Sequence, residues 1–526
     1  MLNSDRQATW DYHNGTKHPG GALLDETWEF NISMRPFLFK VYSDLAPTAL
    51  PLDTTPGSTS ALQALVIDGS ESGTDRQLDL EILTRIFYYS AGITKVLRRR
   101  ETGRTIEFRA YACTGALFHI ELYLVCGDIG GLAAGVYHLD PQGPSIRQLR
   151  AGDYRRVLVE ASGYEPNVEQ AQAILVATDV IARNAVKYQA REYRHAFWDG
   201  GTMLANTLAS AVAHHLSARV VAGFIDSMVS RLLDLDPQRE LALALVPIGA
   251  GAIAAGAPGL PLDPLNLKVQ PIADHEVDVP AIRAMHEASM LPGSASVAAW
   301  RGTVPPRPSL PPQGQLIPLQ PLTGDALATA SLEEVIVRRG STRAFTHDSL
   351  TFEQLSTVLY QSLQEVPADF LEPAGMTLND IYLTVHAIDG LEPGAYVLRR
   401  ETWELELLKA GDFRETSGYL GLKQDLPLDA SVNIFFLANL PPILERFGNR
   451  GYRVAQLDAS IAGGRMYLAS YGQRFGASAL TFYDDAVTDF FSPHASGKSV
   501  MFMIALGHKA KGAIGWVRAD QKVAER

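Results

Sequence analysis

Three arginines, a glycine and a serine lie close together at residues 337–345, in the sequence VRRGSTRAF. A guanidinium group can form paired hydrogen bonds with a phosphate, and a serine hydroxyl adds a further donor. The residues of this kind are Arg338, Arg339, Ser341 and Arg343. By itself a short arginine cluster is more often a solvated surface, so its meaning depends on the elements around it. In a suitable setting it would hold a phosphorylated ligand.

Those elements follow a repeat. Tyr123 and Tyr382 lie in two similar segments, residues 121–155 and 380–414, and are 259 residues apart. Further pairs at the same spacing are Tyr193 and Tyr452, Arg194 and Arg453, and Asp199 and Asp458. One spacing that persists over this range indicates two duplicated halves.

A proline-rich stretch at residues 291–324 separates the halves and is expected to be an extended linker. We therefore expect a first half at residues 1–290 and a second at residues 325–526. Apolar and polar residues alternate in FHIELYLVC and DIYLTVHAI, which predicts strands. Small and apolar residues at helical spacing in AFWDGGTMLANTLASAVAHHL and AQLDASIAGGRMYLASYGQRF predict closely packed central helices. Each half is thus predicted to be α+β.

Composition limits the function. The chain of 526 residues has a net charge of -12, which argues against nucleic acid as its partner. Its two cysteines, Cys113 and Cys126, form no CxxC pair, so we expect no structural zinc and a cytoplasmic location. The polar N-terminus predicts no signal peptide. Residues 241–262 are uncharged, but their glycines and prolines favour a short strand and a loop over a membrane span.

In its context the arginine segment resembles the opening motif of the nitroreductase superfamily. In this chain RRGSTRAF is followed by a predicted helix, SLTFEQLSTVL, and in that superfamily residues of these types hold the phosphate and ribityl chain of FMN. Four further segments resemble one branch of this superfamily, the SagB-type azoline (thiazoline or oxazoline) dehydrogenases. In chain order these segments are YHNGTKHP, ACTGALFHIELYLV, GLAAGVYHLDP and FMIALG. The resemblance extends from about residue 12 to residue 510. The resemblance implies two tandem nitroreductase-like domains that form an intramolecular pseudo-dimer with FMN at their interface.

The resemblance also implies which residues contact FMN. In the second half these are Arg338, Arg339, Ser341 and Arg343, then Leu480, Thr481 and Phe482 beside the flavin ring, and finally His508 and Lys509 near the phosphate. The last two could equally be ordinary loop cations at the end of a strand.

Each half has lost a different part of the family's flavin-binding site, and the two losses are complementary. Ile67 and Asp68 stand where the first half should carry its arginine pair, and an aspartate would repel phosphate. The first half keeps a flavin-facing turn, in which glycine permits close approach to a planar ring. Its residues are Ala112, Cys113, Thr114, Gly115 and Leu117. The matching turn of the second half, EPAGMTLND, is degenerate. We therefore predict one functional FMN and one vestigial site per chain.

Two departures affect the geometry of this turn. His119 stands where the family usually has proline, and Cys113 stands where serine is common. An unreactive buried thiol is the favoured interpretation of Cys113. No metal site is predicted.

Lys187 and Tyr188 match an adjacent lysine–tyrosine pair of the azoline dehydrogenases. Their second-half counterparts, Arg446 and Phe447, lack both functional groups. Oxidation of an azoline removes a proton from a ring carbon and a hydride from its neighbour. A lysine of lowered pKa could take the proton, while Tyr188 orients the ring or passes the proton on.

The leading hypothesis is FMN-dependent oxidation of thiazoline or oxazoline rings to azoles, with dioxygen as the simplest reoxidant. The substrate would be a ribosomal peptide or a peptide on a carrier domain, and other biosynthetic subunits or further oligomers are possible partners. One alternative is an NAD(P)H-dependent nitroreductase or quinone reductase, which rapid flavin bleaching by NAD(P)H would favour. Another is a non-catalytic scaffold of a peptide-modifying complex, which a yellow purified protein would argue against.

Overall fold

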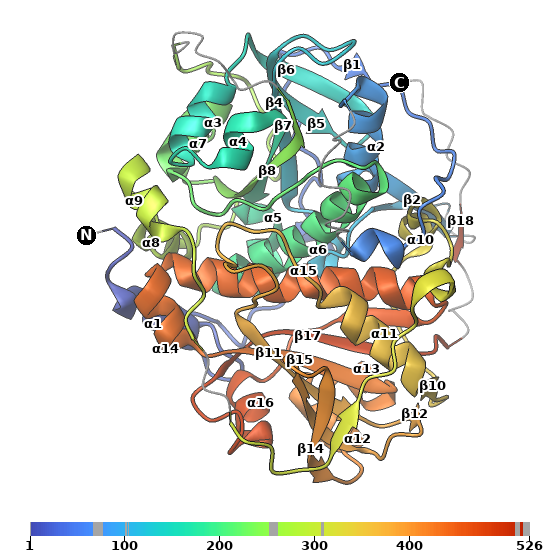
Figure 1. Cartoon of the computed structure of the whole chain (residues 1–526). Helices are drawn as coiled ribbons and strands as arrows, with labels where there is room; N and C mark the ends of the chain where they lie inside the picture. Colours follow the sequence, from blue (N-terminus) through green and yellow to red (C-terminus); the bar gives the residue numbers. More distant parts are fainter. Residues whose placement is uncertain are drawn as a thin grey trace.

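The structure is a computed structural model that describes residues 2–66, 77–99, 103, 105–251, 261–306, 310–510 and 516–518. Two antiparallel sheets lie towards opposite ends of the molecule, with two long helices between them (Figure 1). The first sheet, in spatial order, contains β1 (Thr48–Ala49), β6 (Ser145–Ala151), β5 (Gly135–Asp140), β4 (Ile120–Cys126), β7 (Ala171–Val180) and β8 (Glu240–Ala250). The second contains β16 (Gly476–Ala479), β17 (Ser499–Gly507), β15 (Val432–Ala438), β11 (Asn379–Val385), β13 (Gly394–Arg399), β14 (Glu404–Ala410) and β9 (Leu316–Pro318).

The register of the two sheets repeats with the sequence. Tyr123 of β4 lies opposite Val176 of β7, and Tyr382 of β11 lies opposite Phe435 of β15. Both members of the second pair lie 259 residues after those of the first. The sequence spacing is therefore a structural duplication, and the predicted α+β class is confirmed.

Two buried helices form the centre of the molecule, α6 (Glu192–Ala213) and α15 (Arg450–Gly472). Small residues bring their backbones together. A Cβ built on Gly201 of α6 would lie 1.9 Å from Ser460 Oγ, and one on Gly464 of α15 would lie 2.6 Å from Ala205 Cβ. One continuous apolar core, with residues from both halves, surrounds this contact.

The remaining helices cover the sheets and the two central helices. In the first half they are α1 (Arg6–Gly15), α2 (Leu80–Ala91), α3 (Arg155–Ala161), α4 (Pro166–Gln170), α5 (Ile181–Tyr188), α7 (Asp226–Leu233) and α8 (Pro280–Ala288). In the second half they are α10 (Leu332–Arg338), α11 (Phe352–Ser362), α12 (Arg414–Leu420), α13 (Asp425–Asp429), α14 (Leu440–Phe447) and α16 (Asp484–Phe491). Two small sheets complete the fold: β10 (Leu350–Thr351) with β12 (Ile388–Asp389), and β2 (Ile93–Arg99) between β3 (Thr105–Arg109) and β18 (Trp516–Arg518).

The segment between the halves has structure of its own. Residues 291–324 contain α9 (Ser294–Trp300) and β9, and β9 pairs with β14 at the edge of the second sheet. The domain boundaries at residues 290 and 325 stay a prediction.

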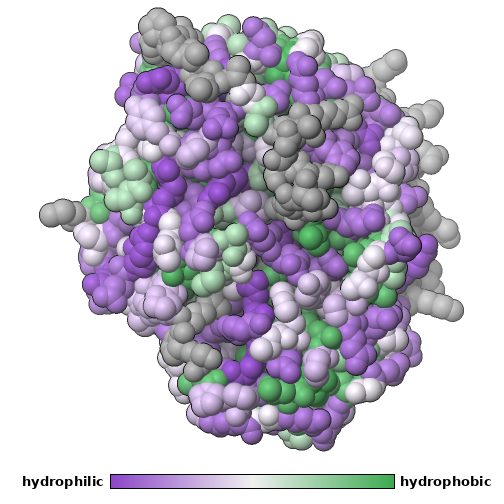
Figure 2. Space-filling model, viewed as in Figure 1, coloured by the Kyte–Doolittle hydropathy of each residue, from purple (hydrophilic) through white to green (hydrophobic). Residues whose placement is uncertain are grey.

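Among the described residues, no helix has both the length and the apolar character that crossing a membrane requires. The first part of the uncharged stretch at residues 241–262 lies in β8, as expected, while residues 252–260 lie outside the described part. Hydrophilic residues predominate on the face drawn in Figure 2, and hydrophobic ones form small, separate patches.

Candidate functional site

The arginine segment begins where α10 ends, and α10 begins with a capping box between Ser331 and Glu334. Arg338, its last residue, donates to the carbonyl of Tyr471 at 2.5 Å. Arg339 is buried and points into the first half. Its Nη2 donates to the carbonyl of Ala110 at 2.9 Å, two residues before the predicted flavin-facing turn. The arginine segment of one half therefore meets the turn of the other.

The turn itself contains a short 3-10 helix, η4 (Thr114–Ala116). Helix α6 anchors it through hydrogen bonds. Asp199 of α6 accepts hydrogen bonds from the backbone N–H and the hydroxyl of Thr114, both at 2.8 Å. Gly115 has φ +63, and a Cβ built on it would lie 3.0 Å from the hydroxyl of Tyr188. Only glycine leaves that space open here without strain. The turn thus lies directly against Tyr188.

Lys187 and Tyr188 end α5, beside this turn. Lys187 is half-buried, with Nζ 5.1 Å from the ring centroid of Tyr188. Partial burial and the positive charge of Arg343 lower the pKa of Lys187. Burial and the charge of Asp199 raise the pKa of Tyr188, so this hydroxyl stays protonated near neutral pH. Arg343 is in the second half, so the two halves meet electrostatically at this pair.

Other predicted residues lie around the arginine segment. Lys509 Nζ lies 4.6 Å from the ring centroid of Tyr471, and burial together with the charge of Arg338 lowers the pKa of Lys509. Ser341 Oγ is 3.1 Å from the hydroxyl of Tyr467. Lys95 of β2, which sequence reasoning missed, donates to the carbonyl of Arg339 at 2.9 Å. Basic groups from both halves therefore gather here.

The remaining predicted contacts differ in position. Leu480 is half-buried and its N–H donates to the carbonyl of Met503 at 3.1 Å. The carbonyl of His508 accepts from the N–H of Thr346 at 2.9 Å, and its ring is half-exposed. Phe482 is fully buried, with its ring centroid 5.7 Å from that of Trp198 in α6. Phe482 thus packs into the interface between the halves, whereas Leu480 and His508 are only partly buried.

The donors present fit the phosphate and hydroxyl groups of FMN. Arg338, Arg343 and Lys509 have no carboxylate within ion-pair distance in the described part of the chain. The hydroxyls of Thr342 and Thr481 are buried and have no hydrogen-bond partner among these residues. Arg343 and Lys509 are exposed and can be solvated by water, so the unsatisfied buried hydroxyls are what favours a polar ligand, and the nearby cations would suit an anionic one.

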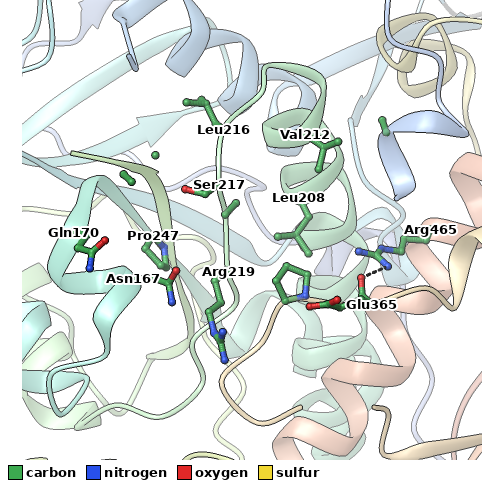
Figure 3. A pocket seen from close by; sticks show the side chains of 15 residues that line it. Asn167, Gln170, Leu208, Val212, Leu216, Ser217, Arg219, Pro247, Glu365 and Arg465 are labelled. Atoms are coloured by element: carbon green, nitrogen blue, oxygen red, sulfur yellow. Dashed lines mark hydrogen bonds between the residues drawn. The ribbon is translucent and has the colours of Figure 1, made fainter. Parts of the chain in front are cut away.

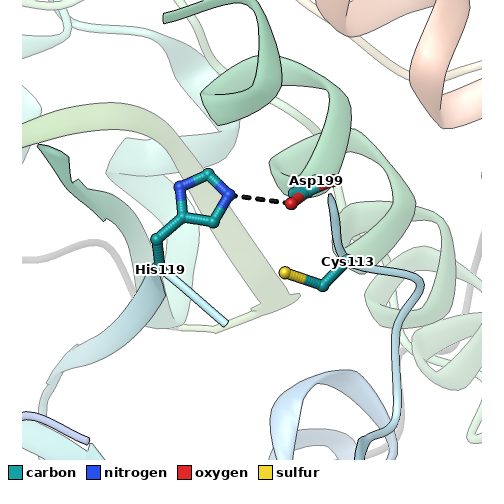
Figure 4. A group of neighbouring side chains, drawn as sticks. All are labelled: Cys113, His119 and Asp199. Atoms are coloured by element: carbon teal, nitrogen blue, oxygen red, sulfur yellow. Dashed lines mark hydrogen bonds and ion pairs between the residues drawn. The ribbon is translucent and has the colours of Figure 1, made fainter. Parts of the chain in front are cut away.

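His119 is a second residue whose role the sequence did not predict, although it was noted as a departure from proline. Its Nδ1 lies 2.6 Å from Asp179 Oδ1 and 3.3 Å from Glu192 Oε1, and its Nε2 lies 2.7 Å from Asp199 Oδ2 (Figure 4). Burial alone would lower the pKa of His119, but the charge of Asp179 and hydrogen bonds to Asp179 and Asp199 raise it well above its ordinary value. A protonated His119 therefore holds Asp199, which in turn holds Thr114.

Cys113 lies beside this histidine. Burial and the charge of Asp199 raise the pKa of Cys113 to about 11, so it remains a thiol near neutral pH. Its sulfur accepts a hydrogen bond from the N–H of Phe118 at 3.0 Å. The group Cys113, His119 and Asp199 has metal-binding residue types, but the ligand atoms of His119 and Asp199 are already hydrogen-bonded to each other.

The second half keeps the same anchor under its own turn. Asp458 accepts from the hydroxyl of Thr377 at 2.6 Å and from the N–H of Leu378 at 2.8 Å. Leu378 stands 259 residues after His119, so the contacts of His119 with Asp179 and Asp199 have no counterpart at this position of the second half. Ile67 and Asp68, where the first half was expected to have lost its arginines, lie outside the described residues.

Comparison with known proteins agrees with this architecture. The model of the nitroreductase family matches residues 140–250 and 336–508. The chain belongs to the nitroreductase family. The two matched regions fall in the two halves, so the prediction of tandem nitroreductase-like domains is confirmed.

Individual members of the family are similar to this chain over different lengths. The crystal structure of a putative nitroreductase from Anabaena variabilis has a TM-score of 0.73 and 24% identity, covering 96% of this chain and 99% of that one. At this identity the likeness shows the fold alone. The putative nitroreductase MJ1384 of Methanocaldococcus jannaschii is 24% identical over 163 residues, which is 30% of this chain and 82% of that protein.

A third similar protein is the microcin B17-processing protein McbC of Escherichia coli. It is 29% identical over 143 residues, which is 26% of this chain and 52% of McbC. The match therefore spans about half the length of that relative. Family membership identifies the chain as nitroreductase-like and favours an oxidoreductase; the roles of individual site residues stay predictions.

Proposed function

We propose that the protein is an FMN-dependent dehydrogenase that oxidises thiazoline or oxazoline rings of a peptide to the aromatic azoles. One observation carries this proposal: Arg343 of the second half acts on the Lys187–Tyr188 pair of the first half, beside the glycine turn. In this proposal the predicted phosphate-binding segment and the candidate base would line one crevice. The partial similarity to a microcin B17-processing protein supports a peptide substrate.

In this proposal, one FMN binds per chain and, when bound, supplies a hydride acceptor. Arg338, Ser341, Arg343 and Lys509 would hold its phosphate and ribityl chain. The backbone of the turn at Gly115 would lie beside the ring, and the hydroxyls of Thr342 and Thr481 would gain partners. His508 would remain at the rim.

The protein's own groups would handle the proton. Lys187 must be neutral to take the proton from the ring carbon, and both partial burial and Arg343 favour the neutral amine. Tyr188 keeps its proton and can donate a hydrogen bond to a ring heteroatom. The substrate would lose one proton to Lys187 and one hydride to the cofactor, and dioxygen would be the final electron acceptor.

We also propose functional boundaries at residues 1–290 and 325–526, since each half supplies different parts of this crevice. A carrier domain or other biosynthetic subunits would present the peptide. The relationship to a putative nitroreductase keeps reduction by NAD(P)H as the second candidate function.

The test is Lys187→Ala, assayed on a peptide that carries a thiazoline. We expect the purified protein to be yellow with an FMN-to-chain ratio near one, and the variant to retain FMN. Turnover should fall by about 10²–10⁴-fold, as for loss of a general base. Lys268→Ala, which removes an exposed lysine elsewhere, should change neither quantity.

Four results would contradict the proposal. Unchanged turnover in Lys187→Ala would remove the base, and an FMN ratio near two would refute the single site. Rapid bleaching of the flavin by NAD(P)H, equal in both variants, would favour the nitroreductase alternative. Colourless protein that binds no added FMN would favour a scaffold.

A further inference from the structure

A cavity of about 230 Å³ lies on the other side of the pseudo-dimer, between the end of β8, the last turns of α6 and residues of the second half (Figure 3). It shares no lining residue with the proposed FMN crevice. Apolar side chains of Leu208, Val212 and Leu216 form one wall. Arg465 of α15 reaches the cavity from the opposite half.

The duplication identifies this cavity as the counterpart of the FMN crevice. Leu208 and Val212 stand 259 residues before Tyr467 and Tyr471, which flank Ser341 and Lys509 in that crevice. The strand contacts are related but shifted by one residue: Val221 N–H donates to the carbonyl of Leu245, whereas Leu480, 259 residues after Val221, donates to Met503, 258 residues after Leu245.

The chemistry at this counterpart has changed. Two tyrosines are replaced by aliphatic side chains, so the wall that offers hydroxyls in one crevice is apolar in the other. Asn206 of α6 donates to the carbonyls of Tyr89 and Ala110 at 3.1 and 2.9 Å. Arg465, 259 residues later, donates through Nη1 to the carbonyls of Gln364 and Glu365 at 3.1 and 3.0 Å. A neutral amide has thus become a cation.

That cation lacks a bonded counter-ion. Arg465 is 2% exposed, and within the described part of the chain its hydrogen bonds run through Nη1 alone, to neutral carbonyls. Glu365 and Asp458 act on its charge from nearby, but neither carboxylate is within ion-pair distance. Burial lowers the pKa of Arg465 to about 10, so it is still charged at neutral pH.

The second arginine of the cavity differs in this respect. Arg219 Nη2 lies 2.6 Å from Glu372 Oε1, and its Nε lies 3.6 Å from Glu165 Oε1. Its charge is therefore already balanced. Nε and Nη2 of Arg465 remain as a pair of parallel donors, the geometry that matches one carboxylate.

We propose that this cavity binds a small molecule with one carboxylate and a compact apolar body. The carboxylate would pair with Arg465, and the body would pack against Leu208, Val212 and Leu216. The volume lies below the roughly 300–1,000 Å³ of sites for drug-sized ligands, so the ligand is small. A free acid and the C-terminus of a peptide share this chemistry.

Isothermal titration of the FMN-loaded protein tests the proposal, with benzoate, hexanoate and isobutyrate as probes and benzamide as the uncharged match to benzoate. We expect at least one of the acids to bind once per chain and benzamide to bind at least tenfold more weakly. A dipeptide acid titrated against its amide distinguishes a peptide C-terminus from a free acid.

Two variants localise the binding. Arg465→Gln should weaken the acid at least tenfold, whereas Arg474→Gln, which removes an exposed arginine just beyond α15, should not. If Arg465→Gln fails to fold, Leu208→Phe, which fills the cavity and leaves the charge in place, should abolish binding.

Several results would overturn the inference. No heat from any acid up to about 10 mM would mean no useful affinity. Equal affinity for benzoate and benzamide, or binding that both cavity variants leave unchanged, would exclude the Arg465 contact. A second FMN that Leu208→Phe removes would assign the cavity to flavin.

Discussion

At the scale of single residues, the contact between halves that matters most for the chemistry is electrostatic. Partial burial lowers the pKa of Lys187, and the positive charge of Arg343 lowers it further. Because the proposed base acts in its neutral form, turnover should rise as the pH rises through this pKa. Arg343→Gln removes the charge and raises the pKa of Lys187, so the rising limb of the turnover–pH profile should move to higher pH. Arg343→Lys keeps the charge and should leave the limb in place, with both variants assayed under saturating FMN. A shift to lower pH in Arg343→Gln would contradict the assignment.

The same scale shows what the sequence could reveal of the site. Three parts of the candidate site were recognisable because each is a contiguous motif: the arginine segment, the glycine turn and the lysine–tyrosine pair. The group of His119, Asp179 and Asp199 was not, since the two aspartates follow His119 by 60 and 80 positions and meet it only in the fold. The one available signal was an unexpected residue type at His119. Lys95 gave no signal, because a lysine in a strand is ordinary.

At the scale of elements, two glycines of α6 differ sharply in their surroundings. A Cβ on Gly201 would lie 1.9 Å from Ser460 Oγ and 2.9 Å from the backbone nitrogen of Ile461, whereas one on Gly200 would meet only the end of Leu243 at 3.2 Å. Replacement by alanine gives each position the same gain in helix propensity of about 1 kcal/mol. Gly201→Ala should therefore be less stable than Gly200→Ala by about 1–3 kcal/mol, the usual cost of overpacking. Urea unfolding of both variants measures the difference, and equal midpoints would show that α15 moves away freely.

Elements of this kind were largely predictable. The small residues of α6 and α15 predicted closely packed central helices, and the common spacing predicted two duplicated halves. The pairing of β2 with β18 was not predicted. The sequence of a strand does not specify its partner, and these two strands lie far apart in the chain, in different halves. Structure within residues 291–324 was also missed, because prolines favour extended chain and hide a strand such as β9 that pairs only at a sheet edge.

At the scale of the whole molecule, two reciprocal ion clusters tie the halves together. Asp484 of the second half pairs with Arg191 and Arg194 of the first, at 2.9 and 2.5 Å. Asp226 of the first half pairs in the same way with Arg450 and Arg453 of the second, at 2.7 and 2.8 Å. These arginines are related by the 259-residue spacing. The duplication therefore built the interface twice, even though duplicated positions of the two central helices, such as Leu208 and Tyr467, now carry different side chains.

Neutralising one of these buried carboxylates should loosen the whole molecule rather than one half. Burial alone would raise the pKa of Asp484, but the charges of Arg191 and Arg194 outweigh it and hold the pKa well below its ordinary value. Its stabilising effect is thus present above the ordinary carboxyl pKa of about 3.9 and is lost as the pH falls below that value.

Asp484→Asn leaves two buried arginines without a counter-ion and should cost about 3–5 kcal/mol at pH 7. Its neighbour Asp485 is 72% exposed and pairs with Lys17, so Asp485→Asn should cost less than about 1 kcal/mol. Thermal midpoints measured from neutral to acid pH should fall more steeply for the wild type than for Asp484→Asn. Parallel curves for the two proteins would mean that this ion cluster does not hold the halves together.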